Sequence, residues 1–101
     1  MLVNSLDFSC GDFFPAILQD NKRATILGTK TAGAGGYVLE TSFLNLQGIA
    51  HFSYTGSIAF RLDGQPIENY GVTPDIVYNM TTYDLQNNYG QYTRTIQEAL
   101  K

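Results

Sequence analysis

The stretch Asn4–Asp12 reads Asn-Ser-Leu-Asp-Phe-Ser-Cys-Gly-Asp and joins an apolar start, Leu2–Val3, to an apolar run over residues 13–18. This order predicts a short buried strand, a tight turn and a helix. Ser9 would lie at the turn, where unpaired backbone N–H groups meet the positive end of the helix dipole. A hydroxyl there can cap the helix, or it can attack a carbonyl whose oxyanion the same N–H groups stabilise.

Ser9 and Asp12 also have the form of a capping box, in which a serine caps the helix and an acid three residues later binds back to it. Capping boxes are far commoner than catalytic serines, so this short pattern alone favours the cap. The rest of the chain has to decide between the two interpretations.

The composition predicts a small globular domain with an unusual surface. The 101 residues suffice for one modest core, and 44% of them are apolar. Only 15% are charged, which suggests that a partner or a missing part of the same chain covers some of the surface. The net charge of −3 offers no basic patch, so we expect no nucleic-acid partner.

Cys10 is the single cysteine, so an internal disulfide is excluded. We expect a buried and inert thiol beside the helix start. The sequence has no apolar run long enough to span a membrane. The chain begins almost directly in a strand, which suggests a piece of a longer protein.

The first helix should place Phe13, Phe14, Ile17 and Leu18 on one side and end near Asp20, with Asn21 as a C-cap in the left-handed conformation. Pro15 predicts a kink, or a regular helix that begins only near Phe14. A second strand is predicted over residues 24–28. Strand, helix and strand in this order form a βαβ unit with parallel strands.

A glycine-rich loop, Thr29–Gly36, follows the second strand. It is not a phosphate-binding Walker loop, because that pattern requires a lysine where this chain has Ala34. Two strand-like runs over residues 37–46 and 49–60 then predict a hairpin turning at Gln47–Gly48, with a bulge near Gly56.

Residues 67–77 predict a loop leading into a short edge strand, because Pro74 cannot take part in a central ladder. The polar and aromatic segment over residues 79–90 fits no element clearly. Residues 92–100 predict a closing helix with Ile96, Ala99 and Leu100 on one side.

Four stretches together resemble peptidase family S41, the serine peptidases that include tricorn and the C-terminal processing (tail-specific) proteases. They are Asp7–Asp12, Gln19–Ala24, Gly28–Gly36 and Ile67–Asp75, in family-like order and spacing. The resemblance implies an α/β fold with a partial ClpP/crotonase-like core, a βαβ unit followed by antiparallel strands and a C-terminal helix. It also implies that residues 1–101 form a single partial domain, the C-terminal portion of a catalytic domain.

Carried over by position, the resemblance implies that Ser9 is the nucleophile and that the backbone N–H groups of Ser9 and Cys10 form part of an oxyanion hole. One branch of the family uses a lysine base where this chain has Ala34, so a Ser-Lys dyad is absent. The other branch, with tricorn and a chlamydial member that the chain resembles most, uses serine, histidine and glutamate. Glu68 matches that glutamate, which would orient the imidazole.

The catalytic histidine of these relatives lies well upstream of the serine, outside the sequence given. His51 lies in the middle of a predicted strand, where we interpret it as a structural side chain on a sheet face. Gly11 replaces an alanine found in many relatives. The carboxylates Glu40, Asp63 and Asp75 lack the spacing of metal ligands, so neither metal nor cofactor is expected.

The sequence therefore predicts the C-terminal part of a bacterial serine endopeptidase that acts on protein or peptide substrates. The isolated chain should be inactive, and it should bind upstream parts of its parent chain or a second copy of itself. The alternative is a catalytically silent binding or assembly domain of the same fold. The resemblance points to the bacterial envelope or to secretion.

Overall fold

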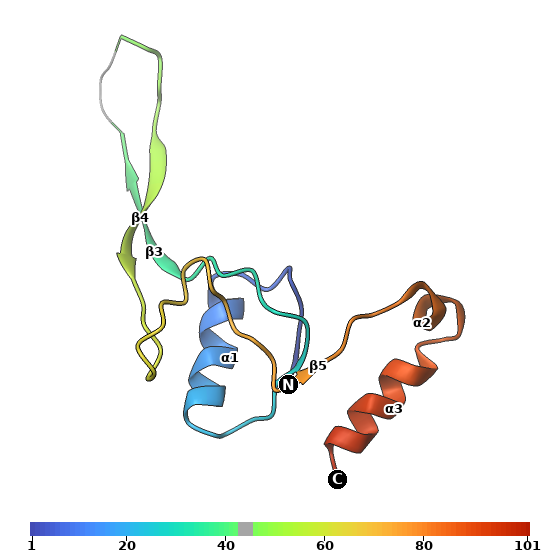
Figure 1. Cartoon of the computed structure of the whole chain (residues 1–101). Helices are drawn as coiled ribbons and strands as arrows, with labels where there is room; N and C mark the ends of the chain where they lie inside the picture. The colour runs from blue at the N-terminus through green and yellow to red at the C-terminus, as the bar shows by residue number, and fades with distance from the viewer. Residues whose placement is uncertain (43–45) are drawn as a thin grey trace.

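The structure is a computed structural model and describes residues 1–42 and 46–101. The elements in chain order are β1 (Leu2–Val3), α1 (Cys10–Asp20), β2 (Leu27–Gly28), β3 (Gly36–Thr41), β4 (Phe52–Ile58), β5 (Ile76–Val77), α2 (Thr82–Gln86) and α3 (Gly90–Ala99) (Figure 1). The α/β class is confirmed, with a βαβ unit, an antiparallel pair and a closing helix.

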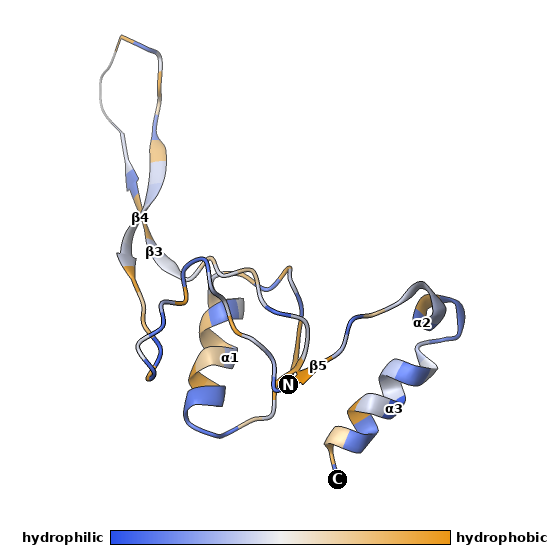
Figure 2. Ribbon diagram, viewed as in Figure 1, coloured by the Kyte–Doolittle hydropathy of each residue, from blue (hydrophilic) through white to orange (hydrophobic). Residues whose placement is uncertain are grey.

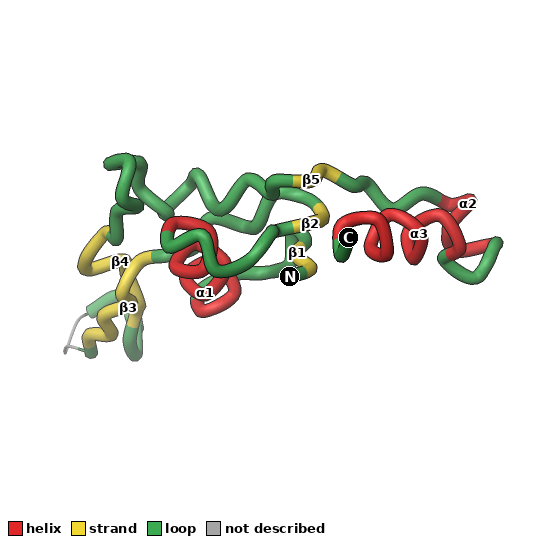
Figure 3. The backbone as a smooth tube through the Cα atoms, turned by 90° about the horizontal axis from the view of Figure 1, so that it is seen from below, coloured by secondary structure: helices red, strands yellow, loops and turns green. Residues whose placement is uncertain are grey.

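Strands β1, β2 and β5 form a parallel sheet in the order β1-β2-β5, so β5 is an edge strand as predicted. Figure 3 shows these strands between α1 and α3. The second strand is shorter than the predicted residues 24–28. The N–H of Ile26 donates to the carboxylate of Asp75 at 2.7 Å, so a side chain takes the place of a ladder partner there.

Helix α1 begins at Cys10 and continues through Pro15, so a regular start near Phe14 is wrong. The left-handed residue after the helix is Lys22 (φ 54°), whereas Asn21 has φ −90°. The Asn21 side chain donates to the carbonyl of Ile17 at 2.8 Å, which satisfies a helix-end carbonyl without a left-handed turn.

The buried face of α1 also differs from the prediction. Asp12, Pro15 and Ala16 are buried, whereas Phe14 and Ile17 are more than half exposed. Phe13 is partly buried and packs against the core, as predicted, whereas Phe14 and Ile17 face outward because the helix turns Pro15 and Ala16 toward the rest of the chain.

The predicted hairpin is confirmed as the antiparallel pair β3–β4. Tyr37 pairs with Ser57 and Val38 with Thr55, so Gly56 is the extra residue of a bulge, as predicted. Strand β4 is shorter than the predicted run over residues 49–60, because it covers only Phe52–Ile58. Strand β3 ends at Thr41, and residues 43–45 of the first predicted run lie outside the described residues. Figure 1 shows the hairpin projecting from the sheet and helices, and β4 is exposed along its whole length.

The closing helix is confirmed and begins at Gly90, two residues before the predicted start. Ile96, Ala99 and Leu100 line a cavity of about 220 Å³ together with Met1 and Leu2 at the sheet edge. The apolar side of α3 therefore faces β1, although the two are not closely packed.

The buried apolar core is small. It consists of Val3, Ala16, Ile26, Leu27, Ile67 and Val72. The radius of gyration is 17.7 Å, whereas a compact domain of this length has about 13 Å. Strand β5 and the N-terminal segment are among the strongly hydrophobic parts in Figure 2, and apolar residues also occur along the projecting hairpin.

Candidate active site

Ser9 precedes α1 in a strained conformation. Its φ is 56° and its ψ −116°, and its side chain makes no capping hydrogen bond, so the predicted capping box is wrong. A positive φ is uncommon outside glycine and persists where the surrounding structure imposes it. Here the Ser9 N–H donates to the carbonyl of Ala34 at 3.0 Å. The hydroxyl is thus held at the strand-to-helix turn without a capping role.

Asp12 binds the glycine-rich loop instead of Ser9. Its carboxylate is fully buried and accepts hydrogen bonds from the Thr31 hydroxyl at 2.5 Å and from the N–H groups of Gly33 and Ala34 at 2.9 Å. This role does not show in the sequence, because an acid in the first helical turn has the form of a cap. The signal was the loop itself, whose backbone N–H groups need acceptors once buried.

The glycine-rich loop packs directly against the segment that carries Glu68. The Asn69 N–H donates to the Gly33 carbonyl at 2.7 Å. Gly33 has φ 75°, and a Cβ added to it would lie 2.8 Å from the nitrogen of Gly71, whose φ is 58°. The two backbones approach too closely for a side chain between them, which explains both glycines.

Glu68 is half-buried beside the start of β3. Its Oε2 is buried and has no hydrogen-bond partner among the described residues. A Cβ added to Gly36 would lie 3.3 Å from this oxygen. Ser9 therefore touches the glycine-rich loop at Ala34, and Glu68 lies against the same loop two residues later.

Cys10 is exposed, so the predicted buried thiol is wrong. Its N–H occupies the first position of α1, where an α-helix offers no intrahelical acceptor. Gly11 is explained by its surroundings, because a Cβ there would lie 3.0 Å from the Cβ of Asp7. Glycine at this position thus avoids a close contact.

His51 is exposed and lies in the connection before β4, so its predicted place in mid-strand is wrong. The reason is that pairing starts only at Phe52, opposite Thr41.

Glu40, Asp63 and Asp75 are the carboxylates for which the sequence offered no metal-ligand spacing. In residues 1–42 and 46–101, no group of three His, Cys, Asp or Glu side chains could hold a metal ion. Asp75 accepts from the Ile26 N–H and the Gln19 side chain, both at 2.7 Å, which is a structural role. Within the same residues, no helix has the length and hydrophobicity needed to cross a bilayer.

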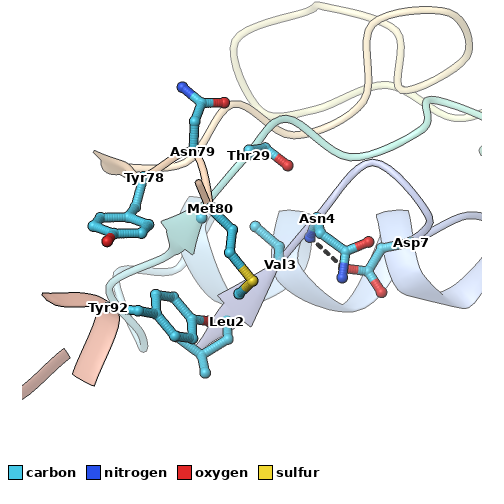
Figure 4. A pocket seen from close by; sticks show the side chains of 10 residues that line it. Leu2, Val3, Asn4, Asp7, Thr29, Tyr78, Asn79, Met80 and Tyr92 are labelled. Carbon is cyan, nitrogen blue, oxygen red and sulfur yellow. Dashed lines mark hydrogen bonds between the residues drawn. The ribbon is translucent and has the colours of Figure 1, made fainter. Parts of the chain in front are cut away.

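A cavity of about 460 Å³ opens at the carboxyl ends of β1, β2 and β5 (Figure 4). One wall is the turn that leads to Ser9, where the Asn4 N–H donates to the Asp7 carboxylate at 2.7 Å. Neither Ser9 nor Glu68 is among its lining residues. This edge of a parallel sheet is where ligands bind in many α/β folds.

Tyr78 and Tyr92 form another part of this cavity, with ring centroids 5.2 Å apart. Burial and the hydrogen bond from its hydroxyl to the Asp84 carboxylate raise the pKa of Tyr78 to about 12. Tyr78 therefore stays protonated at neutral pH and is no candidate for a general base.

The family model of peptidase family S41 matches residues 1–78. An uncharacterized protein of Chlamydia muridarum is 50% identical over 101 residues, which cover 99% of this chain and 17% of that protein. The structure of mature CPAF complexed with lactacystin is 47% identical with a TM-score of 0.91, and the match covers 98% of this chain and 19% of CPAF. A carboxy-terminal-processing protease of Bartonella bacilliformis is 29% identical over 99 residues, 98% of this chain and 21% of that protein. The chain thus spans about a fifth or less of the length of these relatives.

Proposed function

The chain belongs to peptidase family S41, as its sequence motifs predicted, and we propose that it is the C-terminal portion of the catalytic domain of a serine endopeptidase. In this proposal the Ser9 hydroxyl attacks the carbonyl carbon of a peptide bond. A histidine from the preceding part of the full-length protein takes the hydroxyl proton and passes it to the leaving amine. Glu68 accepts a hydrogen bond from that histidine and stabilises its charged form.

The observation that carries the proposal is the arrangement of Ser9 and Glu68 around one loop. Ser9 is strained at a helix start, as is the nucleophile in other strand-turn-helix hydrolases. Glu68 keeps a buried oxygen without a partner in the described chain. An unpaired buried carboxylate oxygen is costly, so a donor from outside this chain would stabilise it. An imidazole N–H supplied by the full-length protein fits that need.

We assign the oxyanion hole to the backbone at Ser9 and Cys10, with unequal roles. The Cys10 N–H lacks an intrahelical acceptor and is available to a developing oxyanion. The Ser9 N–H is engaged by the Ala34 carbonyl and would have to leave it in order to contribute.

The test is the variant Ser9→Ala in the full-length protein that carries this chain. We expect casein hydrolysis to fall on the order of 10⁶-fold, because the nucleophile is removed. A fluorophosphonate probe should label the wild type and the control Ser5→Ala, a serine of the same turn, but not Ser9→Ala. Because CPAF has been solved with lactacystin, we also expect this compound to compete with the labelling.

Equal labelling of Ser9→Ala and wild type would exclude Ser9 as the nucleophile. A folded wild-type protein that neither cleaves casein nor reacts with the probe would instead favour the silent binding or assembly domain.

A further inference from the structure

A buried polar cluster joins the helix that follows Ser9 to the segment that follows Glu68. It consists of Asp12, Thr31 and the backbone N–H of Val72, and all three residues are buried. The Thr31 hydroxyl donates to Asp12 Oδ1 at 2.5 Å and accepts from the Val72 N–H at 2.7 Å. Two hydrogen bonds therefore lead from α1 to the segment of the proposed catalytic acid.

A second connection runs through the glycine-rich loop. The Ala34 N–H donates to Asp12 Oδ2, and the Ala34 carbonyl accepts the Ser9 N–H that holds Ser9 at its positive φ. The Gly33 N–H donates to Asp12 Oδ1, while the Gly33 carbonyl accepts from Asn69, the neighbour of Glu68. Asp12 thus binds the N–H groups of the two residues whose carbonyls contact the nucleophile and the acid segment.

A buried carboxylate is a poor choice for stability alone. Taking a charge out of water is costly, and well-packed apolar groups often stabilise a fold as much as a buried ion does. What a carboxylate supplies here is three hydrogen bonds in fixed directions, to one hydroxyl and two backbone N–H groups. Its benefit is therefore geometric, because it fixes the loop relative to α1.

We propose that Asp12, acting through Thr31 and Ala34, is the positioning residue that sets the distance between the Ser9 hydroxyl and the Glu68 carboxylate. The inference rests on the proposed function. A displacement of about 1 Å in a catalytic group can lower the rate about 100-fold. The hydrogen bonds of Asp12 can therefore control turnover although Asp12 does not touch the substrate.

The test uses Asp12→Asn in the full-length protein. The amide nitrogen of asparagine cannot accept a hydrogen bond, so it would oppose at least one of the donors now bound. We expect kcat and the rate of fluorophosphonate labelling at Ser9 both to fall about 100-fold. The KM should change far less, because Asp12 is buried away from the substrate.

Three further variants separate positioning from stability. Thr31→Val removes the hydroxyl and should lower the labelling rate, whereas Thr31→Ser keeps the hydroxyl and should restore it. The matched control is Asp84→Asn, which removes an equally buried carboxylate that accepts from Thr81 and Tyr78 on the other side of the sheet. It should leave the labelling rate of the folded protein unchanged.

A folded Asp12→Asn protein labelled at the wild-type rate would overturn the positioning role, while an unlabelled Ser9→Ala would still support the proposed function. If Asp12→Asn does not fold, Thr31→Val decides, and wild-type kcat in a folded Thr31→Val protein overturns the inference. A wild type that resists the probe removes the proposed function and this inference with it.

Discussion

At the scale of single residues, Glu68 is the buried carboxylate to which our proposal assigns a histidine partner. Its Oε2 is buried without a partner in the described chain, next to the loop that holds Ser9. Burying such an oxygen is unfavourable unless a donor reaches it. In the proposed triad, the Glu68 carboxylate would hold the histidine in one tautomer and stabilise its cationic form, which offsets the free energy of burying the oxygen.

We predict that Glu68→Gln in the full-length protein lowers kcat about 10⁴-fold, less than the loss expected for Ser9→Ala. The amide keeps the shape of the side chain but carries no charge to stabilise an imidazolium. Steady-state peptide hydrolysis measures the effect, and Glu98→Gln on the exposed side of α3 is the control. Wild-type kcat in Glu68→Gln would contradict the triad assignment.

Tyr78 and Asp84 provide a second prediction at this scale. The pKa of Tyr78 is raised to about 12 by burial and by Asp84, so its protonated form stabilises the fold below about pH 10 and that contribution is lost between about pH 10 and 12. The pKa of Asp84 is lowered, chiefly by the Thr81 hydroxyl and N–H, so its contribution is lost only in acid, below its unfolded pKa.

Tyrosinate absorbance sums over the 7 tyrosines of the chain, so the contribution of Tyr78 is the difference between the wild type and Tyr78→Phe. At pH 11 Tyr78→Phe should lose little absorbance relative to wild type, because Tyr78 is still mostly protonated there. If Tyr78→Phe instead lost the signal of nearly one ionised tyrosine at pH 11, the pKa of Tyr78 would be ordinary.

At the scale of elements, one sequence pattern gave opposite results at two helix starts. Thr81 and Asp84 form a true capping box, which was not predicted from the sequence and which explains the short helix α2. Ser9 and Asp12 have the same spacing, but no box forms there. The two helix starts differ because of a tertiary contact: the N–H groups of Gly33 and Ala34, in a loop about 20 residues away in sequence, donate to Asp12. Local spacing cannot reveal such donors.

The larger elements were more predictable than their boundaries. Apolar periodicity located α1 and α3, aromatic and β-branched runs around Gln47–Gly48 located the hairpin, and glycine located the bulge at Gly56. The extent of β2 and the outward face of α1 depended on partners distant in sequence, such as Asp75. The resemblance of the motifs identified Ser9 and Glu68 as candidate site residues, whereas their contacts with one loop, the strain at Ser9 and the hydrogen bonds of Asp12 emerged only from the fold.

We predict that Gly33→Ala loosens the contact between the glycine-rich loop and the Glu68 segment. The new Cβ would lie 2.8 Å from a backbone nitrogen, and the left-handed φ adds strain of about 1–3 kcal/mol. In the full-length protein, hydrogen exchange over residues 29–34 and 67–72 should speed up by about 10-fold or more. Gly64→Ala is the matched control, since Gly64 has φ 85° but open space around it. Unchanged exchange in Gly33→Ala would show that the close backbone contact is not what holds the two segments.

At the scale of the whole molecule, the chain exposes more surface than its length requires. Its accessible area is 7365 Å², whereas a compact monomer of this mass exposes about 5,700 Å². The excess includes Phe14 and Ile17 on α1 and Tyr37 on the hairpin. Strands β1 and β5 also form the two edges of the sheet. Such apolar faces and edges favour association with another chain or with the rest of a longer one.

The isolated chain should therefore self-associate and show no peptidase turnover. Turnover is not expected because serine is a weak nucleophile without an adjacent base, and exposed His51 lies on the projecting hairpin.

Self-association is expected through the β1 edge, where Leu2 is half exposed, and sedimentation at increasing concentration measures it. Leu2→Lys should shift the population toward monomer, because a charged residue on an edge strand opposes pairing. Leu62→Lys, at an exposed position outside the sheet, should not. A concentration-independent monomer in the wild type would refute the edge argument, and casein cleavage that Ser9→Ala abolishes would show that the chain needs no external base.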